Sequence, residues 1–173
     1  MGKITFGVVG FGHIGKKHAL MVSGNVESEL TAVVDTDSEK VKQAKELYPN
    51  IQVFETIEEL IEANLNLDVV NICTPNGMHA SQSIRMLESR SHVVIEKPMG
   101  LTRQECEEVI FKSLQVSRYV FCVKQNRYSP SSKWLKSLIA ENKLGRINMV
   151  QLSCYWNRDE RYYKAGGWKG TNA

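Results

Sequence analysis

The sequence has few of the features that would place a protein outside the ordinary globular class. No apolar run approaches the roughly 20 residues that a membrane-spanning helix needs, and no low-complexity segment interrupts the chain. The four cysteines lie far apart and form no C-x-x-C pair, which argues against a structural metal site. The net charge is only +3 and the two signs are interspersed, so nucleic-acid binding is not supported.

What is present is the composition of a globular chain. Of its 173 residues, 42% are hydrophobic and 24% are charged, enough for one domain with a full core and a short remainder. Three cysteines, Cys73, Cys122 and Cys154, fall in apolar strand-like runs, and Cys106 falls on the apolar face of a predicted helix. We therefore expect buried, reduced thiols and a cytoplasmic protein.

Apolar runs rich in β-branched residues alternate with helical patterns along most of the chain. This alternation predicts an α/β fold with a doubly wound parallel sheet. The predicted strands lie near residues 3–9, 29–35, 51–54, 67–73, 91–96 and 119–123.

Three of the predicted helices begin with the same Thr-x-x-Glu pattern, at Thr36, Thr56 and Thr102. In this pattern the threonine hydroxyl and the glutamate carboxylate satisfy free backbone N–H groups at the helix start. Helical spacing also predicts three core-facing stripes. Their members are Val41, Ala44 and Tyr48, then Ala80, Ile84 and Leu87, and finally Cys106, Val109, Ile110 and Leu114.

A G-x-G-x-x-G motif, Gly10 to Gly15, follows the first predicted strand and opens a helix. In dinucleotide sites the first glycine permits the turn, the second lets the backbone approach the pyrophosphate, and the third lets the helix pack on the sheet. The diphosphate binds at the helix N-terminus, where free N–H groups and the helix dipole favour an anion. The motif therefore predicts a dinucleotide site.

Asp35 stands about 20 residues after the last glycine, at the end of the second predicted strand. A carboxylate there accepts hydrogen bonds from both ribose hydroxyls and repels a 2′-phosphate, and no arginine follows closely to offset it. NAD is therefore favoured over NADP. The alternative is that the glycines are ordinary turn residues and that Asp35 is an acid at a helix start.

Ligands of open parallel sheets bind beyond the carboxyl ends of the strands. The fourth predicted strand is followed there by Thr74, Pro75, Asn76 and His79, and the fifth by Glu96-Lys97-Pro98. Both segments are expected beside the nicotinamide.

Lys97 is the candidate acid/base, because a lysine in its neutral form can accept the proton of a substrate hydroxyl. A cis Lys97-Pro98 bond would hold it rigidly. The alternative is a solvated Glu-Lys pair at a turn. For His79, the alternative to a nicotinamide or substrate contact is a helix-start residue that is hydrogen-bonded to the adjacent loop.

The doubly wound pattern ends near residues 124–132. A helix marked by Trp134, Leu135, Leu138 and Ile139 follows, and then a predicted strand over 147–156. A strand of this kind needs a partner, so we expect it to pair with a second copy or with a segment beyond Ala173. The aromatic and cationic tail from Tyr155 to Lys169 suits a sugar nucleotide, or else it is a surface strand and loop.

Four segments, in this order and spacing, resemble the Gfo/Idh/MocA oxidoreductase family: Gly10 to His18, Cys73 to His79, Glu96 to Pro98 and Gln125 to Tyr128. The similarity covers the whole chain. It implies that Lys97 is catalytic and that His79 contacts the nicotinamide side. The ending, Trp156 to Thr171, is similar to the branch that oxidises the C3 hydroxyl of UDP-N-acetylglucosaminuronate in lipopolysaccharide O-antigen synthesis.

The resemblance and the motifs together predict two sets of binding residues and no metal site. The expected NAD-binding residues are Gly10, Phe11, Gly12, His13, Ile14, Gly15, Asp35, Thr36, Thr74, Pro75, Asn76, His79, Glu96, Lys97, Gln125 and Trp168. The expected substrate-binding residues are Lys97, Asn126, Arg127, Tyr128 and Tyr163.

Family members continue with an Asp-Gly-Gly segment, a histidine motif and an open antiparallel sheet that supplies most substrate contacts and the oligomer interface. We therefore expect residues 1–124 to form a Rossmann NAD-binding domain and residues 125–173 to be the truncated start of an α+β antiparallel-sheet domain. The resemblance implies a homo-oligomer for the full-length form.

The primary hypothesis is an NAD-dependent sugar or sugar-nucleotide oxidoreductase in which cofactor binding survives better than turnover. The competing hypothesis is a non-catalytic NAD(H)-binding or redox-sensing module that regulates a partner.

Overall fold

The computed structural model describes residues 2–160, 162 and 163. The chain divides after Val123 into two compact units. In the first unit, six parallel strands form one sheet in the order β3-β2-β1-β4-β5-β6. The strands are β1 (Ile4–Val9), β2 (Ser28–Val34), β3 (Gln52–Phe54), β4 (Val69–Ile72), β5 (His92–Ile95) and β6 (Val120–Cys122). This arrangement confirms the predicted doubly wound fold.

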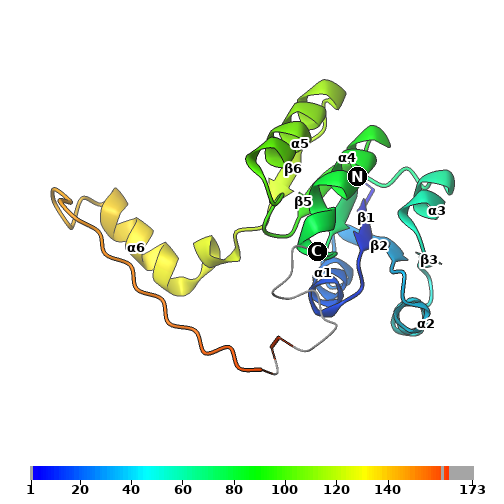
Figure 1. The fold of residues 1–173 in the computed structure, drawn as a ribbon, viewed down its shortest axis with the longest axis horizontal. Helices are drawn as coiled ribbons and strands as arrows, with labels where there is room; N and C mark the ends of the chain where they lie inside the picture. The colour runs from blue at the N-terminus through cyan, green and yellow to red at the C-terminus, as the bar shows by residue number, and fades with distance from the viewer. Residues whose placement is uncertain (1, 161, 164–173) are drawn as a thin grey trace. The chain divides into compact units, whose positions relative to one another are not determined.

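Helices cover both faces of the sheet, as Figure 1 shows. They are α1 (His13–Ser23), α2 (Ser38–Leu47), α3 (Ile57–Glu62), α4 (His79–Glu88) and α5 (Arg103–Val116), with the 3-10 turn η1 (Asn76–Met78) before α4. Each face has its own core. Ala19 and Ala44 bring α1 and α2 to one core, and Leu60, Leu87 and Val109 bring α3, α4 and α5 to the other. Burial on both faces explains the apolar strands.

The strand order reverses between β1 and β4, because the chain proceeds outward to β2 and β3 and then returns to β4 on the other side of β1. Such a switch point separates the loops that follow the two neighbouring strands and leaves a crevice at their carboxyl ends. The loop after β1 begins at Gly10, and the loop after β4 begins at Cys73.

Two of the three predicted helix caps are confirmed. Thr56 and Thr102 each accept a backbone N–H from the glutamate three residues on, and that glutamate returns the bond. The prediction for Thr36 is wrong, because the N-cap of α2 is Asp37, whose carboxylate accepts the Glu39 N–H at 3.1 Å. Aspartate is the better N-cap acceptor and lies one residue nearer to the helix.

The third predicted stripe is only partly buried. Val109 is fully buried, but Ile110 and Leu114 on the same helix are 48% and 74% exposed. The reason is that α5 lies at the β6 edge of the sheet order, so a narrow line of its side chains reaches the core. Among the described residues, nothing covers the rest of that stripe.

The second unit begins with the 3-10 turn η2 (Gln125–Tyr128) and the helix α6 (Pro130–Ala140), which confirms the predicted helix. The predicted strand over 147–156 is wrong for the described chain, which has no regular secondary structure there. A strand forms only where a neighbouring strand completes its hydrogen bonds, and no described segment pairs with these residues. Cys154 is consequently exposed and not buried as predicted.

Candidate functional site

The glycine turn leaves β1 at the switch point, and its backbone geometry requires glycine at Gly10. Gly10 has a φ of +89°, and a Cβ on it would lie 2.8 Å from the Cys73 carbonyl oxygen. The Gly10 N–H donates to the Val34 carbonyl at 2.8 Å, which anchors the turn to the end of β2. The turn is thus packed against the ends of both strands that neighbour β1.

The other two glycines of the motif differ in what surrounds them. A Cβ on Gly15 would overlap the Gly10 carbonyl oxygen, so Gly15 allows α1 to approach the strand. A Cβ on Gly12 would meet no atom of the chain within 4 Å. Gly12 is the N-cap of α1 and makes no side-chain cap bond, and the first turn of α1 contains no acidic residue. The open space in front of this helix N-terminus suits an anion such as a pyrophosphate.

Asp35 follows β2 and lies beside this turn, with only 9% of its surface exposed. One carboxylate oxygen accepts the Phe11 N–H at 2.7 Å, and the other accepts the Asp37 N–H at 3.0 Å. Lys40 Nζ lies 3.3 Å from that second oxygen. Each carboxylate oxygen has two lone pairs, and the three donors leave one of them, on the oxygen that accepts the Phe11 N–H, for a ribose hydroxyl.

Neither the Phe11–Asp35 bond nor the Lys40 ion pair was predicted from the sequence. The Lys40 ion pair could have been predicted from the position of Lys40, which is the third residue of α2 and lies in the helical turn that faces the preceding carboxylate. Lys40 also lies 3.4 Å from Asp37. A cation therefore does stand beside Asp35, although it is already shared between two carboxylates.

The remaining predicted cofactor residues near the turn offer mainly backbone. Phe11 is fully buried, with its ring packed edge-on against Tyr48, so only its main chain faces the turn. His13 and Ile14 are exposed at the start of α1, and Thr36 is exposed after Asp35.

On the other side of the switch point, Thr74, Pro75 and Asn76 lead from β4 into η1. The Thr74 hydroxyl donates to the Gln82 side-chain oxygen at 2.6 Å, which ties this loop to α4. All three residues are partly exposed, so they are accessible to a ligand at the carboxyl edge.

His79 begins α4 and is almost completely buried, at 1% exposure. Its Nδ1 lies 2.7 Å from the Pro98 carbonyl oxygen, and its Nε2 lies 2.8 Å from the Thr74 carbonyl oxygen. A carbonyl only accepts, so an imidazole with one N–H donates to one of these two carbonyls and contacts the other. This geometry favours the second role considered above, a helix-start histidine bonded to adjacent loops, over a direct contact with nicotinamide.

Glu96-Lys97-Pro98 follows β5, and the Lys97-Pro98 peptide bond is cis, as the motif indicated. The Glu96 side chain is 13% exposed, and its Oε1 lies 3.2 Å from His18 Nε2. The Glu96 Oε2 accepts the Lys97 backbone N–H at 3.2 Å. Lys97 itself is exposed, and within the described chain its ammonium has no hydrogen bond or ion pair. The Lys97 side chain is therefore available to a ligand.

Cys73 completes this part of the edge, directly after β4. Burial raises the pKa of the Cys73 thiol well above its ordinary range, and the nearby Glu96 carboxylate raises it further. Cys73 therefore stays a neutral thiol and packs as a small apolar side chain against the core that α1 and α2 share.

Six of the predicted residues belong to the second unit. Gln125, Asn126, Arg127 and Tyr128 form η2 and are exposed. Tyr163 is 48% exposed and its ring stacks edge-on against Tyr162. Trp168 lies outside the described residues.

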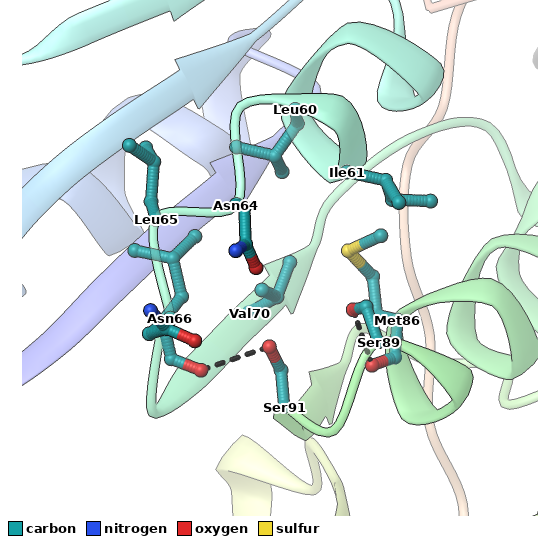
Figure 2. Close-up of a pocket in the computed structure, with 10 residues that line it drawn as sticks. Leu60, Ile61, Asn64, Leu65, Asn66, Val70, Met86, Ser89 and Ser91 are labelled. Atoms are coloured by element: carbon teal, nitrogen blue, oxygen red, sulfur yellow. Dashed lines mark hydrogen bonds between the residues drawn. The ribbon is translucent and has the colours of Figure 1, made fainter.

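One small pocket lies away from all these residues, at the amino ends of β4 and β5. It has a volume of about 30 Å³, and Figure 2 shows it between the end of α3, the start of β4 and the end of α4. The Ser91 hydroxyl closes one side by donating to the Leu67 carbonyl at 2.8 Å. The pocket has room for a water molecule but not for a nucleotide.

The described residues contain no group of three or more histidines, cysteines or carboxylates that could hold a metal ion. No helix in the same residues is long and apolar enough to cross a bilayer.

Residues 4–120 match a protein-family model, GFO_IDH_MocA, described as an oxidoreductase family with an NAD-binding Rossmann fold. This match covers most of the first unit, including the glycine turn, Asp35 and Lys97.

Two solved structures superpose on nearly the whole chain. One is the WlbA dehydrogenase from Bordetella pertussis, in complex with NADH and UDP-GlcNAcA. It is 31% identical with a TM-score of 0.91, and the match covers 97% of this chain and 51% of the WlbA chain. The other is the WlbA dehydrogenase from Chromobacterium violaceum, also with NADH and UDP-GlcNAcA. It is 33% identical with a TM-score of 0.92, and the match covers 98% of this chain and 49% of the WlbA chain.

The chain also resembles curated proteins in sequence. Inositol 2-dehydrogenase from Rhizobium meliloti is 29% identical over 150 residues, which are 87% of this chain and 44% of that protein. The chain spans about half the length of the relatives that it matches.

Proposed function

Because this chain belongs to the GFO_IDH_MocA oxidoreductase family, whose fold binds NAD, we propose that it carries the cofactor site and the acid/base of a sugar or sugar-nucleotide dehydrogenase. The observation that carries this proposal is the grouping at one sheet edge. The glycine turn, Asp35 and Glu96-Lys97-Pro98 all follow the carboxyl ends of strands in the same parallel sheet. A dinucleotide that spans the switch point reaches all three.

The chain's own groups fit the parts of NAD. The open space at Gly12 and the N-terminus of α1 suit the pyrophosphate, and Asp35 suits the adenosine ribose. When bound, NAD accepts the hydride that leaves the carbon of a substrate alcohol. Lys97 Nζ, in its neutral form, takes the proton of the same hydroxyl, so the alcohol becomes a carbonyl.

For the other predicted residues the roles are proposals of the same kind. Thr74, Pro75 and Asn76 border the nicotinamide half of the cofactor, and His79 supports that loop through its contact with the Thr74 carbonyl. In the second unit, Gln125 and Trp168 are the proposed cofactor-binding residues, and Asn126, Arg127, Tyr128 and Tyr163 are the proposed substrate-binding residues.

The proposed substrate is a sugar nucleotide, oxidised at C3 of UDP-N-acetylglucosaminuronate. Support comes from the two WlbA structures, which contain UDP-GlcNAcA. Their identities and TM-scores are higher than those of the apo scyllo-inositol dehydrogenase from Lactobacillus casei, which is 27% identical with a TM-score of 0.77 and covers 83% of this chain and 43% of its own chain. We further propose that the whole protein works as a cytoplasmic homo-oligomer.

Calorimetric titration of the chain with NAD and NADP tests the cofactor assignment. We expect NAD to bind at least about tenfold more tightly than NADP, because a 2′-phosphate would face the Asp35 carboxylate. Equal binding, or a preference for NADP, would contradict the role of Asp35.

The chemistry is tested by adding UDP-GlcNAcA, or myo-inositol as the competing substrate, to the full-length form with NAD and following NADH absorbance. NADH formation with UDP-GlcNAcA that is lost in Lys97→Met supports the proposal. NAD binding that is unaltered in Lys97→Met, with no NADH formed from either substrate, points instead to a non-catalytic NAD(H)-binding module.

A further inference from the structure

Two histidines from different helices contact the segment that carries Lys97. His18 lies on α1, which covers one face of the sheet, and His79 begins α4, which covers the other. Figure 1 shows these two helices on either side of the strands. Their ring nitrogens contact the residues immediately before and after Lys97.

The first contact fixes the residue before Lys97. His18 Nε2 lies 3.2 Å from Glu96 Oε1, with both side chains less than one-fifth exposed. The second oxygen of the same carboxylate accepts the Lys97 backbone N–H at 3.2 Å. His18 thus acts on the main chain at Lys97 through one intervening carboxylate. Gly12 is the N-cap of the same helix, so this bond links the helix whose N-terminus is the proposed pyrophosphate site to the Lys97 segment.

The second contact fixes the residue after Lys97. His79 Nδ1 lies 2.7 Å from the Pro98 carbonyl oxygen, and Nε2 lies 2.8 Å from the Thr74 carbonyl oxygen. The imidazole therefore joins the loop after β4 to the segment after β5. Because His79 is buried, water does not compete for these bonds.

We propose that His18 and His79 are positioning residues that hold Glu96-Lys97-Pro98 from the two faces of the sheet and so set the direction of the Lys97 side chain. The inference rests on the proposed function, in which Lys97 lies beside the nicotinamide. A lysine has a long, flexible side chain, and orientation of a reacting group depends on rigid support from the residues around it. In this chain the support acts on the backbone at either side of Lys97 and leaves its ammonium free for a ligand.

The test compares NADH with ADP-ribose, which has the same adenosine, pyrophosphate and second ribose but lacks the nicotinamide ring. Both ligands are titrated calorimetrically into the chain. We expect the wild type to bind NADH more tightly than ADP-ribose, and Lys97→Met to reduce this difference. Loss of either histidine contact should lower NADH affinity roughly fivefold, as for one hydrogen bond, with ADP-ribose affinity unchanged.

The substitutions at His18 test its bond to Glu96. In His18→Leu the bond is lost, whereas the glutamine amide of His18→Gln places an N–H near the position of Nε2. We expect His18→Leu to lose NADH affinity and His18→Gln to recover it.

The substitutions at His79 form a matched pair. His79→Asn keeps a donor at the Nδ1 position, toward Pro98, and His79→Gln keeps one at the Nε2 position, toward Thr74. Each removes one of the two ring-nitrogen contacts from the same buried site, so their effects on folding are comparable. We expect His79→Asn to retain the preference for NADH and His79→Gln to lose it.

The control is His92→Gln, a histidine at the opposite end of β5 whose Nδ1 accepts the Tyr119 N–H. It should leave both affinities unchanged. If His18→Leu and His79→Gln lower the thermal unfolding midpoint but keep the NADH to ADP-ribose ratio, the inference is overturned and the histidines are only structural. If the wild type binds neither ligand, the proposed function is wrong, and so is this inference, because it depends on that function.

Discussion

The Phe11 N–H donates to the Asp35 carboxylate at 2.7 Å, between residues 24 apart in the sequence. This bond joins the glycine turn after β1 to the end of β2. The residue expected to recognise the adenosine ribose therefore also holds the turn that is expected to receive the pyrophosphate. A change at Asp35 should affect both.

In Asp35→Asn, we expect NAD affinity to fall roughly tenfold and the discrimination against NADP to shrink. The amide keeps the shape of the side chain, but its single oxygen can accept only one of the two backbone N–H groups, and its NH₂ group then faces the other donor. Titration calorimetry with both cofactors measures the ratio. Asp37→Asn is the matched control, because Asp37 also pairs with Lys40 but asparagine still caps α2. An unchanged NAD to NADP ratio in Asp35→Asn would refute the assignment.

Gly12→Ala should weaken NAD binding, whereas Gly15→Ala should destabilise the fold. The Gly12 variant should fold normally, since its Cβ meets no atom of the chain within 4 Å, yet lose at least about tenfold in NAD affinity because the methyl occupies the pyrophosphate space. The Gly15 variant should lose about 1–3 kcal/mol or more of unfolding free energy, because its Cβ overlaps the Gly10 carbonyl.

Urea unfolding and calorimetry separate the two effects. Normal NAD binding by a stable Gly12→Ala protein would mean that the pyrophosphate does not approach this glycine.

Asp68 should contribute to acid unfolding. The Thr5 N–H and hydroxyl donate to one Asp68 oxygen at 2.8 and 2.9 Å, and they lower the pKa of Asp68 below its ordinary 3.8. A carboxyl with a lowered pKa in the folded state stabilises the fold above its unfolded pKa, and this stabilisation is lost as pH falls through the folded pKa. The loss therefore lies below about pH 4 to 5.

Urea unfolding at about pH 6 and about pH 3 checks this contribution. The difference in unfolding free energy between the two pH values should be smaller in Asp68→Asn than in the wild type. Thr5→Val, which removes the hydroxyl and keeps the N–H, should lie between them. Identical acid losses in all three proteins would exclude Asp68 as a contributor.

The cysteines should differ in reactivity. Cys154 is exposed, whereas burial raises the pKa of the Cys73 thiol and so suppresses its thiolate. With Ellman's reagent at about pH 8, Cys154 should react rapidly and Cys73 only after unfolding. Peptide mass spectrometry assigns the sites, and Cys154→Ser should remove the fast phase. Modification of native Cys73 at the rate of Cys154 would show that the thiol is not buried.

Much of the fold was predictable because its signals are local. The β-branched runs predicted all six strands of the sheet, and the Thr-x-x-Glu pattern located the starts of α3 and α5. The same pattern failed at Thr36, because a neighbouring aspartate competes for the cap and the pattern alone does not rank the two. The strand predicted over 147–156 is also absent from the described chain, because a strand depends on a partner that the described chain does not provide.

The residues of the candidate site were predictable from the sequence, but the hydrogen bonds between them were not. The glycine motif, Asp35 and Lys97 were all identified by residue type and by position relative to a strand. The links from Asp35 to Phe11, from His18 to Glu96 and from His79 to Pro98 were not, because each joins residues that are remote in sequence. His79 is the clearest case, since its position suggested a ligand contact and its burial assigns both ring nitrogens to the backbone.

The sequence by itself determined the parallel sheet, the glycine turn and the family, because hydrophobic periodicity and the need for glycine at Gly10 are properties of short segments. Only the tertiary structure decided which faces were covered and which polar groups met. The exposure of Leu114 depends on its helix lying at the edge strand, and the bonds on either side of Lys97 depend on α1 and α4 covering opposite faces. Such contacts follow from the order of strands in space, which no local pattern contains.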